Sequence, residues 1–146
     1  MGQQQLLLLV LGIVIVGLSV VVGIQAFSEN QKKSNADALV NDAIRIASDA
    51  QAWKLKPSAF GGGASASNWT SLDFGQIGYK VGDNSLTTAT AEADQYENLN
   101  GVFDLAMDAG TLTITATSVD GNGDAQNSVV VAVTGTTPGQ VATTIN

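Results

Sequence analysis

The feature that most constrains this chain is an uninterrupted apolar run near its N-terminus. Residues 6–27, LLLLVLGIVIVGLSVVVGIQAF, are broken only by glycines, Ser19 and Gln25. A helix of about 22 residues is roughly 33 Å long, which is enough to cross a hydrocarbon core of about 30 Å. A secretory signal peptide is the alternative, but the run exceeds the usual apolar core of a signal and no small-x-small cleavage site ends it. The sequence therefore predicts a retained apolar helix.

The helical pattern continues beyond the apolar run. Residues 29–56 contain no proline and no glycine, and their apolar residues recur at spacings of three and four, as on one face of a helix. Lys54 and Lys56 lie near the expected C-terminal end, and Pro57 stops the helix. We expect one helix of about 53 residues, on the order of 80 Å long. The apolar stripe of its second half comprises Ala36, Leu39, Val40, Ala43, Ile44, Ala47 and Ala50.

After a linker rich in Gly, Ser and Ala, the apolar period changes to two, which indicates strands. Turn signals separate the strand candidates. We expect an α+β fold in which an antiparallel sheet of about four strands packs one face on the amphipathic stripe. The expected strands are residues 103–107, 112–117 and 129–133, with a weaker one at 141–145 and a short one at 76–81 before a polar segment. The expected segments are 1–28 (apolar helix), 29–56 (amphipathic helix), 57–74 (linker) and 75–146 (sheet head).

Composition excludes most enzyme chemistry. The chain has no histidine and no cysteine, so imidazole acid–base catalysis, cysteine nucleophiles, thiolate zinc sites and disulfides are ruled out. No glycine-rich phosphate loop follows a strand, and a sheet this small offers no cleft for paired carboxylates. We expect no enzyme activity, no cofactor and no metal site. Trp53 and Trp69 flank the linker, where we expect them to fill the junction between helix and sheet.

Charge is distributed unevenly along the 146 residues, which carry 6 basic and 13 acidic side chains. No charged residue precedes Glu29, and residues 81–146 contain no basic one. This balance makes nucleic acid an unsuitable partner, and the acidic head should keep assembled copies dispersed. The acidic cluster Glu92, Asp94 and Glu97 is expected to be a solvated loop.

Two short motifs have a simpler structural interpretation. The DGNGD stretch at 120–124 alternates oxygen-bearing residues as calcium loops do, but Ala125 and Val131 stand where an EF-hand needs glycine and an acid. A hairpin turn is therefore favoured. Asn68 begins an Asn-Trp-Thr glycosylation pattern, which also arises often by chance.

These features together resemble a bacterial type IV pilin in its mature form. The resemblance rests on the apolar segment 1–27, the amphipathic half that follows and the C-terminal sheet, and its specific content lies in residues 1–50. In that family a basic leader is removed and the new N-terminus is methylated. The apolar helix lies in the inner membrane and then forms the core of a helical extracellular filament. The resemblance implies a homopolymer built by pilus assembly machinery at the cell surface, with adhesion or motility as its role.

The resemblance makes Met1 the candidate N-methylation site. Without a leader, Lys32 and Lys33 after the span would draw the C-terminal part to the cytoplasm, and a removed basic leader reverses this bias. Cleavage after Gly2 is the competing interpretation. The chain departs from the family at Gln5, where a glutamate usually neutralises the N-terminal amine of a neighbour; an amide supplies no countercharge.

The other departures are a missing disulfide loop and a missing proline within the apolar helix. Gly12, Gly17 and Gly23 are the expected places of local unwinding or close helix contact, since each costs a helix about 1 kcal/mol relative to alanine. We expect a structural subunit; the alternatives are a minor pseudopilin of a secretion system and a single-span, membrane-anchored binding module. The expected assembly residues are Met1, Gln5, Leu6, Leu7, Leu8, Leu9, Leu11, Ile13, Ile15, Leu18, Val21, Ile24 and Phe27.

Overall fold

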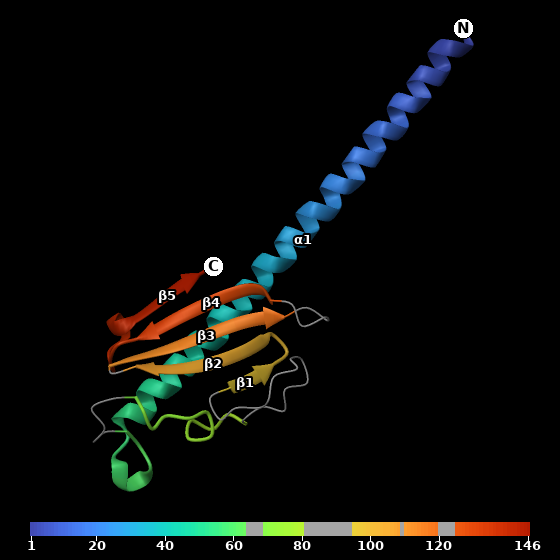
Figure 1. Ribbon diagram of the computed structural model, residues 1–146. Coiled ribbons are helices and arrows are strands. Elements are labelled where there is room, and N and C mark those ends of the chain that lie inside the picture. The colour runs from blue at the N-terminus through green and yellow to red at the C-terminus, as the bar shows by residue number, and fades with distance from the viewer. Residues whose placement is uncertain (64–68, 81–94, 109, 120–124) are drawn as a thin grey trace. The chain divides into compact units, whose positions relative to one another are not determined.

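The chain forms one long helix and one antiparallel sheet (Figure 1). A computed structural model describes residues 1–63, 69–80, 95–108, 110–119 and 125–146. The expected α+β class is confirmed, with a sheet of five strands where four were predicted. In chain order the elements are α1 (Gly2–Leu55), η1 (Ser58–Phe60), β1 (Gln95–Asn98), β2 (Gly101–Asp108), β3 (Thr111–Val119), β4 (Ala125–Val133), η2 (Pro138–Gln140) and β5 (Val141–Ile145).

Helix α1 is 54 residues long, which confirms the predicted length. It ends at Leu55, shortly before Pro57, because the residue before a proline is disfavoured in helical conformation. The chain divides within α1 into two compact units, Met1–Ser34 and Asn35–Asn146. The second unit contains the rest of α1 and the sheet, and the division predicted from the sequence into four segments stays a prediction.

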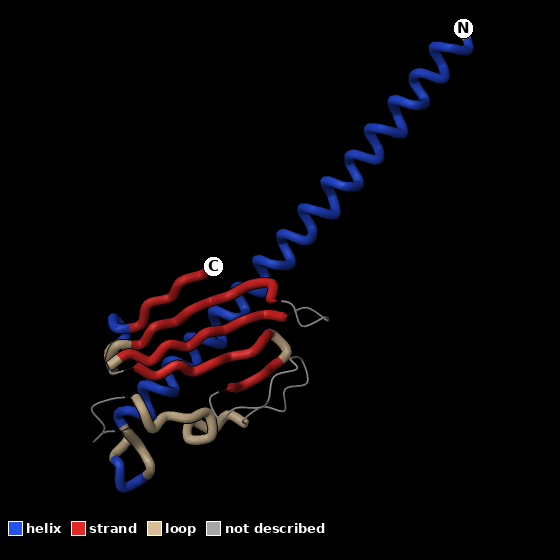
Figure 2. Tube along the Cα trace, in the orientation of Figure 1, coloured by secondary structure: helices blue, strands red, loops and turns tan. Residues whose placement is uncertain are grey.

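The sheet is a meander in which each strand pairs antiparallel with the next (Figure 2). Buried and half-exposed residues alternate along β3, as expected for a strand with one face on the core. Leu112, Ile114 and Ala116 lie on the buried face. The strands predicted at 103–107, 112–117, 129–133 and 141–145 lie within β2, β3, β4 and β5. Strand β1 was not predicted, and Glu97, expected in a solvated loop, lies in it half-buried.

The strand predicted at 76–81 is wrong for its described residues, 76–80. They belong to a series of turns in which the Gly78 amide donates to the Gly75 carbonyl and the Tyr79 amide to the Phe74 carbonyl. Gly78 has a φ of 86°, a left-handed conformation that breaks an extended strand. The apolar residues of the segment, Ile77 and Tyr79, instead pack against the hydrophobic core.

The core lies between the second half of α1 and the inner face of the sheet. The helix contributes three small side chains, Ala43, Ala47 and Ala50, beside a row of large ones, and the sheet contributes large side chains such as Phe103, Ile114 and Val131. Small residues on the helix let it approach the strands closely. At Gly101, the first residue of β2, a Cβ atom would lie 2.9 Å from the Leu39 side chain, so a larger residue there would need a shift of its neighbours.

The buried stripe of α1 is rotated slightly from the predicted one. Ile46 is buried with 1% of its surface exposed, although the predicted stripe omitted it, whereas Ile44 is 44% exposed. Leu39, Ile46 and Trp53 are spaced by seven residues and lie along one buried row. Ile44 falls at the margin of the stripe, one turn after the half-buried Val40.

These two isoleucines provide a matched test of the packing. Ile46→Ala should lower the free energy of unfolding of the head by about 2–5 kcal/mol, because it leaves a cavity in the core. Ile44→Ala should change it by less than about 0.5 kcal/mol, as at other surface positions. Denaturant unfolding of the full chain in detergent, followed by the fluorescence of Trp53 and Trp69, measures both. Equal losses in the two variants would contradict the assigned stripe.

Candidate functional site

The first half of α1 is apolar on every side and is not covered by the rest of the described chain. Its large apolar side chains between residues 6 and 27 have exposed fractions from 51% to 71%. Covering such side chains is worth about 1.5–3 kcal/mol each. By length and composition the helix can cross a membrane, and none of its most apolar stretch is buried within the chain. This surface therefore needs lipid or other protein around it.

The polar groups inside this segment are compatible with an apolar environment. Residues 1–28 carry no charged side chain, and the helix satisfies its backbone groups internally. The Ser19 hydroxyl donates a hydrogen bond of 2.8 Å to the Ile15 carbonyl one turn earlier. The one hydroxyl of the apolar run is thus satisfied without water, as a helix surrounded by lipid or by other helices requires.

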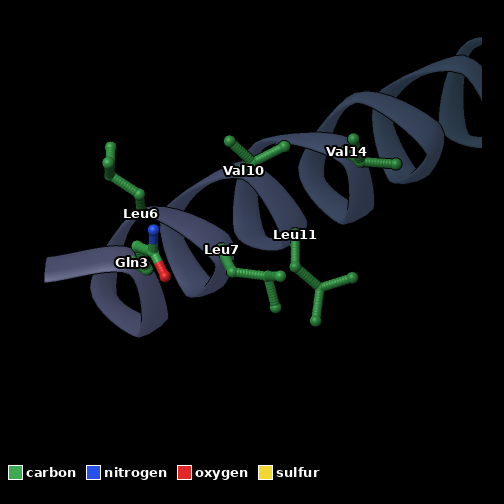
Figure 3. A pocket seen from close by; sticks show the side chains of 6 residues that line it. All are labelled: Gln3, Leu6, Leu7, Val10, Leu11 and Val14. Atoms are coloured by element: carbon green, nitrogen blue, oxygen red, sulfur yellow. The ribbon is translucent and has the colours of Figure 1, made fainter. Parts of the chain in front are cut away.

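A shallow open depression lies near the N-terminal end of this segment (Figure 3). It is lined almost entirely by apolar surface, and its residues recur at spacings of three and four. Such spacing forms the kind of surface into which side chains of a neighbouring helix pack. The lining residues are Gln3, Leu6, Leu7, Val10, Leu11 and Val14.

The depression overlaps the predicted assembly residues only in part. Leu6, Leu7 and Leu11 were predicted, whereas Gln3, Val10 and Val14 were not. Gln3, Val10 and Val14 are spaced by seven and four along the helix, but other residues of this apolar segment share such spacings. All of the predicted assembly residues, from Met1 to Phe27, are exposed in this chain. They surround the helix rather than gathering on one face, so their individual roles stay predictions.

The three glycines are regular helical residues in this chain. Nothing lies within 4 Å of a Cβ placed at Gly12, Gly17 or Gly23, and α1 continues through all three. The predicted unwinding or close contact concerns an assembled state and stays a prediction. Gly12 and Gly23 are eleven residues apart, which places them on nearly the same side of the helix, about three turns from each other.

At the N-terminal end, Met1 is fully exposed and α1 begins at Gly2. Gln5 is exposed in the second turn, and the first turn has no acidic residue. The chain therefore places no carboxylate of its own next to its terminal amine in this part of the helix. Several residues singled out from the sequence lie outside the described residues: the glycosylation candidate Asn68, the acidic residues Glu92 and Asp94, and the DGNGD stretch.

Polar side chains on the second half of α1 tie it to three loops of the head. Asp42 accepts hydrogen bonds from the side-chain amides of Asn98, the last residue of β1, at 2.9 Å, and of Asn100, in the turn between β1 and β2, at 2.7 Å. Gln51 donates to the Gly135 carbonyl at 2.8 Å, between β4 and β5. These contacts fix the sheet at both ends along the helix.

Both tryptophans pack in the junction between helix and sheet, as predicted. Trp53 and Trp69 are 5% and 2% exposed. The Trp53 indole N–H donates to the Gly61 carbonyl at 3.1 Å, and the Lys54 ammonium lies 5.4 Å from the centre of a Trp69 ring. The linker is therefore held against the end of α1 at two described positions, Gly61 and Trp69.

The third tie is a hydrogen bond of 2.6 Å from the Tyr79 hydroxyl to the Asp49 carboxylate. Burial of the phenol raises the pKa of Tyr79 above its ordinary value of 10.0, and the bond to Asp49 raises it further. Arg45 acts in the opposite direction, because a nearby cation favours the phenolate. The neutral phenol is thus the form that the folded head favours.

This shift predicts a pH dependence of stability. Because the folded-state pKa is raised, the phenol contributes full stability below about pH 10 and loses it as pH rises toward the folded-state pKa. Tyr79→Phe should be less stable than the natural chain at neutral pH, and the difference should narrow above about pH 10. Denaturant unfolding of both proteins across this range measures it. A difference that stays constant with pH would contradict the assignment.

Among the described residues, no group of three His, Cys, Asp or Glu side chains is placed to hold a metal ion. Comparison of the sequence with protein-family models, with curated proteins and with solved structures finds no match. The candidate site is therefore defined by its own geometry: a charge-free helix, apolar all round, that precedes a folded sheet head.

Proposed function

We propose that this protein is a structural subunit of a type IV pilus-like filament and has no catalytic role. The observation that carries the proposal is that every residue from 6 to 27 is exposed, all round a helix whose second half belongs to a folded head. The order of the parts, a long N-terminal apolar helix followed by an antiparallel sheet, is the order of that family. A helix apolar on every side suits both a bilayer and a bundle of identical helices.

Because the inner face of the sheet is already covered by α1, we expect partner subunits to bind the apolar half of the helix instead. That inner face is already covered by Leu39, Ile46 and Trp53 of the same chain, together with the alanines of the stripe. In the described part of the chain, residues 6–27 form the largest apolar surface that remains open. The depression lined by Leu7, Val10 and Leu11 offers this helix a place to receive a neighbouring one.

The proposed assembly passes from membrane to filament. Residues 6–27 first lie in the inner membrane, and then in the core of an extracellular homopolymer whose surface is made by the heads. Lipid and protein are similarly apolar, so this transfer gains little from the hydrophobic effect, and cohesion must come from close packing of side chains. Assembly machinery must therefore do the work of extracting each subunit. Met1 would carry the N-terminal methyl group, and no nucleic acid takes part.

Gln5 shapes how subunits would dock in this proposal. In an apolar core, a terminal amine needs a hydrogen-bond acceptor near it. The side-chain oxygen of Gln5 provides an acceptor, but no negative charge. Docking through Gln5 is therefore a hydrogen bond to an uncharged acceptor instead of an ion pair, and it should be less sensitive to salt than an ion pair.

Two leucine-to-lysine variants test the proposal. Leu11→Lys should abolish filaments, because it places a charge in the predicted core, at a cost of about 2.5 kcal/mol or more. The head should stay folded, since Leu11 lies outside its unit. Leu99→Lys is the matched control, because Leu99 is fully exposed in the turn between β1 and β2. Electron microscopy of sheared cell-surface material counts filaments, and tryptophan fluorescence of the purified chains reports folding.

Each alternative predicts a different result of the same preparation. Normal filaments from Leu11→Lys would refute the core assignment. A natural chain that fractionates only with membranes, and never with sheared appendages, would indicate an anchored binding module. A few copies per filament would indicate a minor pseudopilin, whereas hundreds of copies would indicate the main subunit. N-terminal sequencing of the sheared material determines whether Met1 is the processed end.

A further inference from the structure

Strand β5 forms one edge of the sheet, and no described strand pairs with its outer side (Figure 1). At its end, the Ser128 amide donates to the Asn146 carbonyl at 3.4 Å, and the Asn146 amide donates to the Ser128 carbonyl at 2.9 Å. In an antiparallel ladder, such hydrogen-bonded pairs alternate with pairs that exchange no bonds. The register therefore directs the backbone N–H and C=O groups of three residues away from β4: Val141, Thr143 and Ile145.

The free side of β5 lacks the features by which proteins protect a sheet edge. Val141–Ile145 contains no charged residue and no proline, and its register with β4 continues without a bulge. Edge strands are normally blocked by such features or covered, because open backbone groups pair with other strands. The strand at the other end of the sheet, β1, has four residues and carries Glu97. The unblocked edge of β5 therefore indicates a place that receives another strand.

The side chains beside the free backbone groups favour an apolar neighbour. Val141, Thr143 and Ile145 stand opposite buried valines of β4, so they share the face of the sheet that carries the core. Val141 packs against the core, but Ile145 is still 58% exposed. A strand added beside β5 would place alternate side chains in the same rows, where apolar ones cover Ile145. Its other side chains would face water beside Ala142 and Thr144, which are exposed.

Charge determines which strand suits this edge. Exposed Asp104 and Asp108 lie on the water-facing side of the sheet, the side on which those other side chains of the added strand would lie. The chain carries a net charge of −7, so pairing with a second copy would bring two acidic heads together. Basic side chains on the added strand are instead attracted by the head. The occupant that fits is an extended peptide of another protein, with apolar and basic residues in alternation.

We propose that the free edge of β5 binds such a peptide as an additional strand of the sheet. Val141, Thr143 and Ile145 each offer one backbone donor and one acceptor to it. In binding by strand addition, the main-chain bonds supply affinity and the alternate side chains supply selectivity. The inference goes beyond the proposed filament and does not depend on it, because β5 belongs to the folded head of a single chain.

Two variants at one position separate the free edge from the ladder with β4. Thr143→Pro removes an N–H that points to the free edge, so the bonds to β4 stay intact while an added strand loses its central donor. Thr143→Val is the matched control, because it changes the side chain and keeps the N–H. Tryptophan fluorescence of the full chain in a neutral detergent reports whether both variants fold.

The probe is a synthetic heptapeptide that alternates lysine and valine, labelled with a fluorophore and titrated with the full chain in the same detergent. A peptide with glutamate in place of each lysine is its control. Fluorescence anisotropy measures the dissociation constants at low and high salt. Hydrogen exchange of the backbone amides of β5, with and without the lysine peptide, provides the second measurement.

The natural chain and Thr143→Val should bind the lysine peptide alike, and Thr143→Pro should bind it about tenfold more weakly or worse, because a peptide carbonyl is left without its donor. The affinity should fall as salt rises. Bound peptide should slow exchange at Val141, Thr143 and Ile145, while Ala142 and Thr144, which already bond to β4, stay unchanged.

Equal binding by Thr143→Pro and Thr143→Val would overturn the inference, as would equal binding of the lysine and glutamate peptides. If Thr143→Pro fails to fold, exchange in the natural chain decides, and unchanged exchange at Val141, Thr143 and Ile145 overturns it. Slow exchange at these residues in the concentrated chain without peptide would identify a second copy as the occupant and would also overturn it. Because no filament is needed for these measurements, their failure is distinct from a failure of the proposed function.

Discussion

The structure depends on one constraint: the apolar side chains of residues 6–27 cannot be covered by the chain that carries them. Three other features of residues 6–27 are consistent with that condition. The segment has no charged side chain, Ser19 satisfies its hydroxyl within the helix, and the backbone groups are paired along α1. A protein that needed only a membrane anchor would meet the same condition with any apolar helix of about 20 residues. What distinguishes this chain is that the same helix continues as the central element of a folded head.

Within α1 the change from the apolar half to the amphipathic half alters what the helix packs against, not how the backbone is built. In the second half, the alanines of the buried stripe allow the strands to lie close to the helix. Phe103, Ile114 and Val131 of the strands fill the space between them. Asp42, Asp49 and Gln51 then hold three loops by hydrogen bonds. The head core is completed by its own helix, so burial of the first half is left to other molecules. In the proposed filament, assembly and folding thus use different halves of one element.

The sequence predicts those parts of the fold in which local pattern and tertiary packing agree. The end of α1 before Pro57 and strands β2 to β5 follow from helix stops and from period-two patterns that coincide with burial. Strand β1 was missed because Gln95–Asn98 has no apolar alternation and is defined only by its pairing with β2. Ile44 was placed in the buried stripe and Ile46 was omitted, because spacings of three and four residues do not determine which side of the helix the sheet covers. At the candidate site, the apolar segment was predictable as a whole. Val10 and Val14 were not singled out, because a surface apolar all round gives no reason to prefer one face.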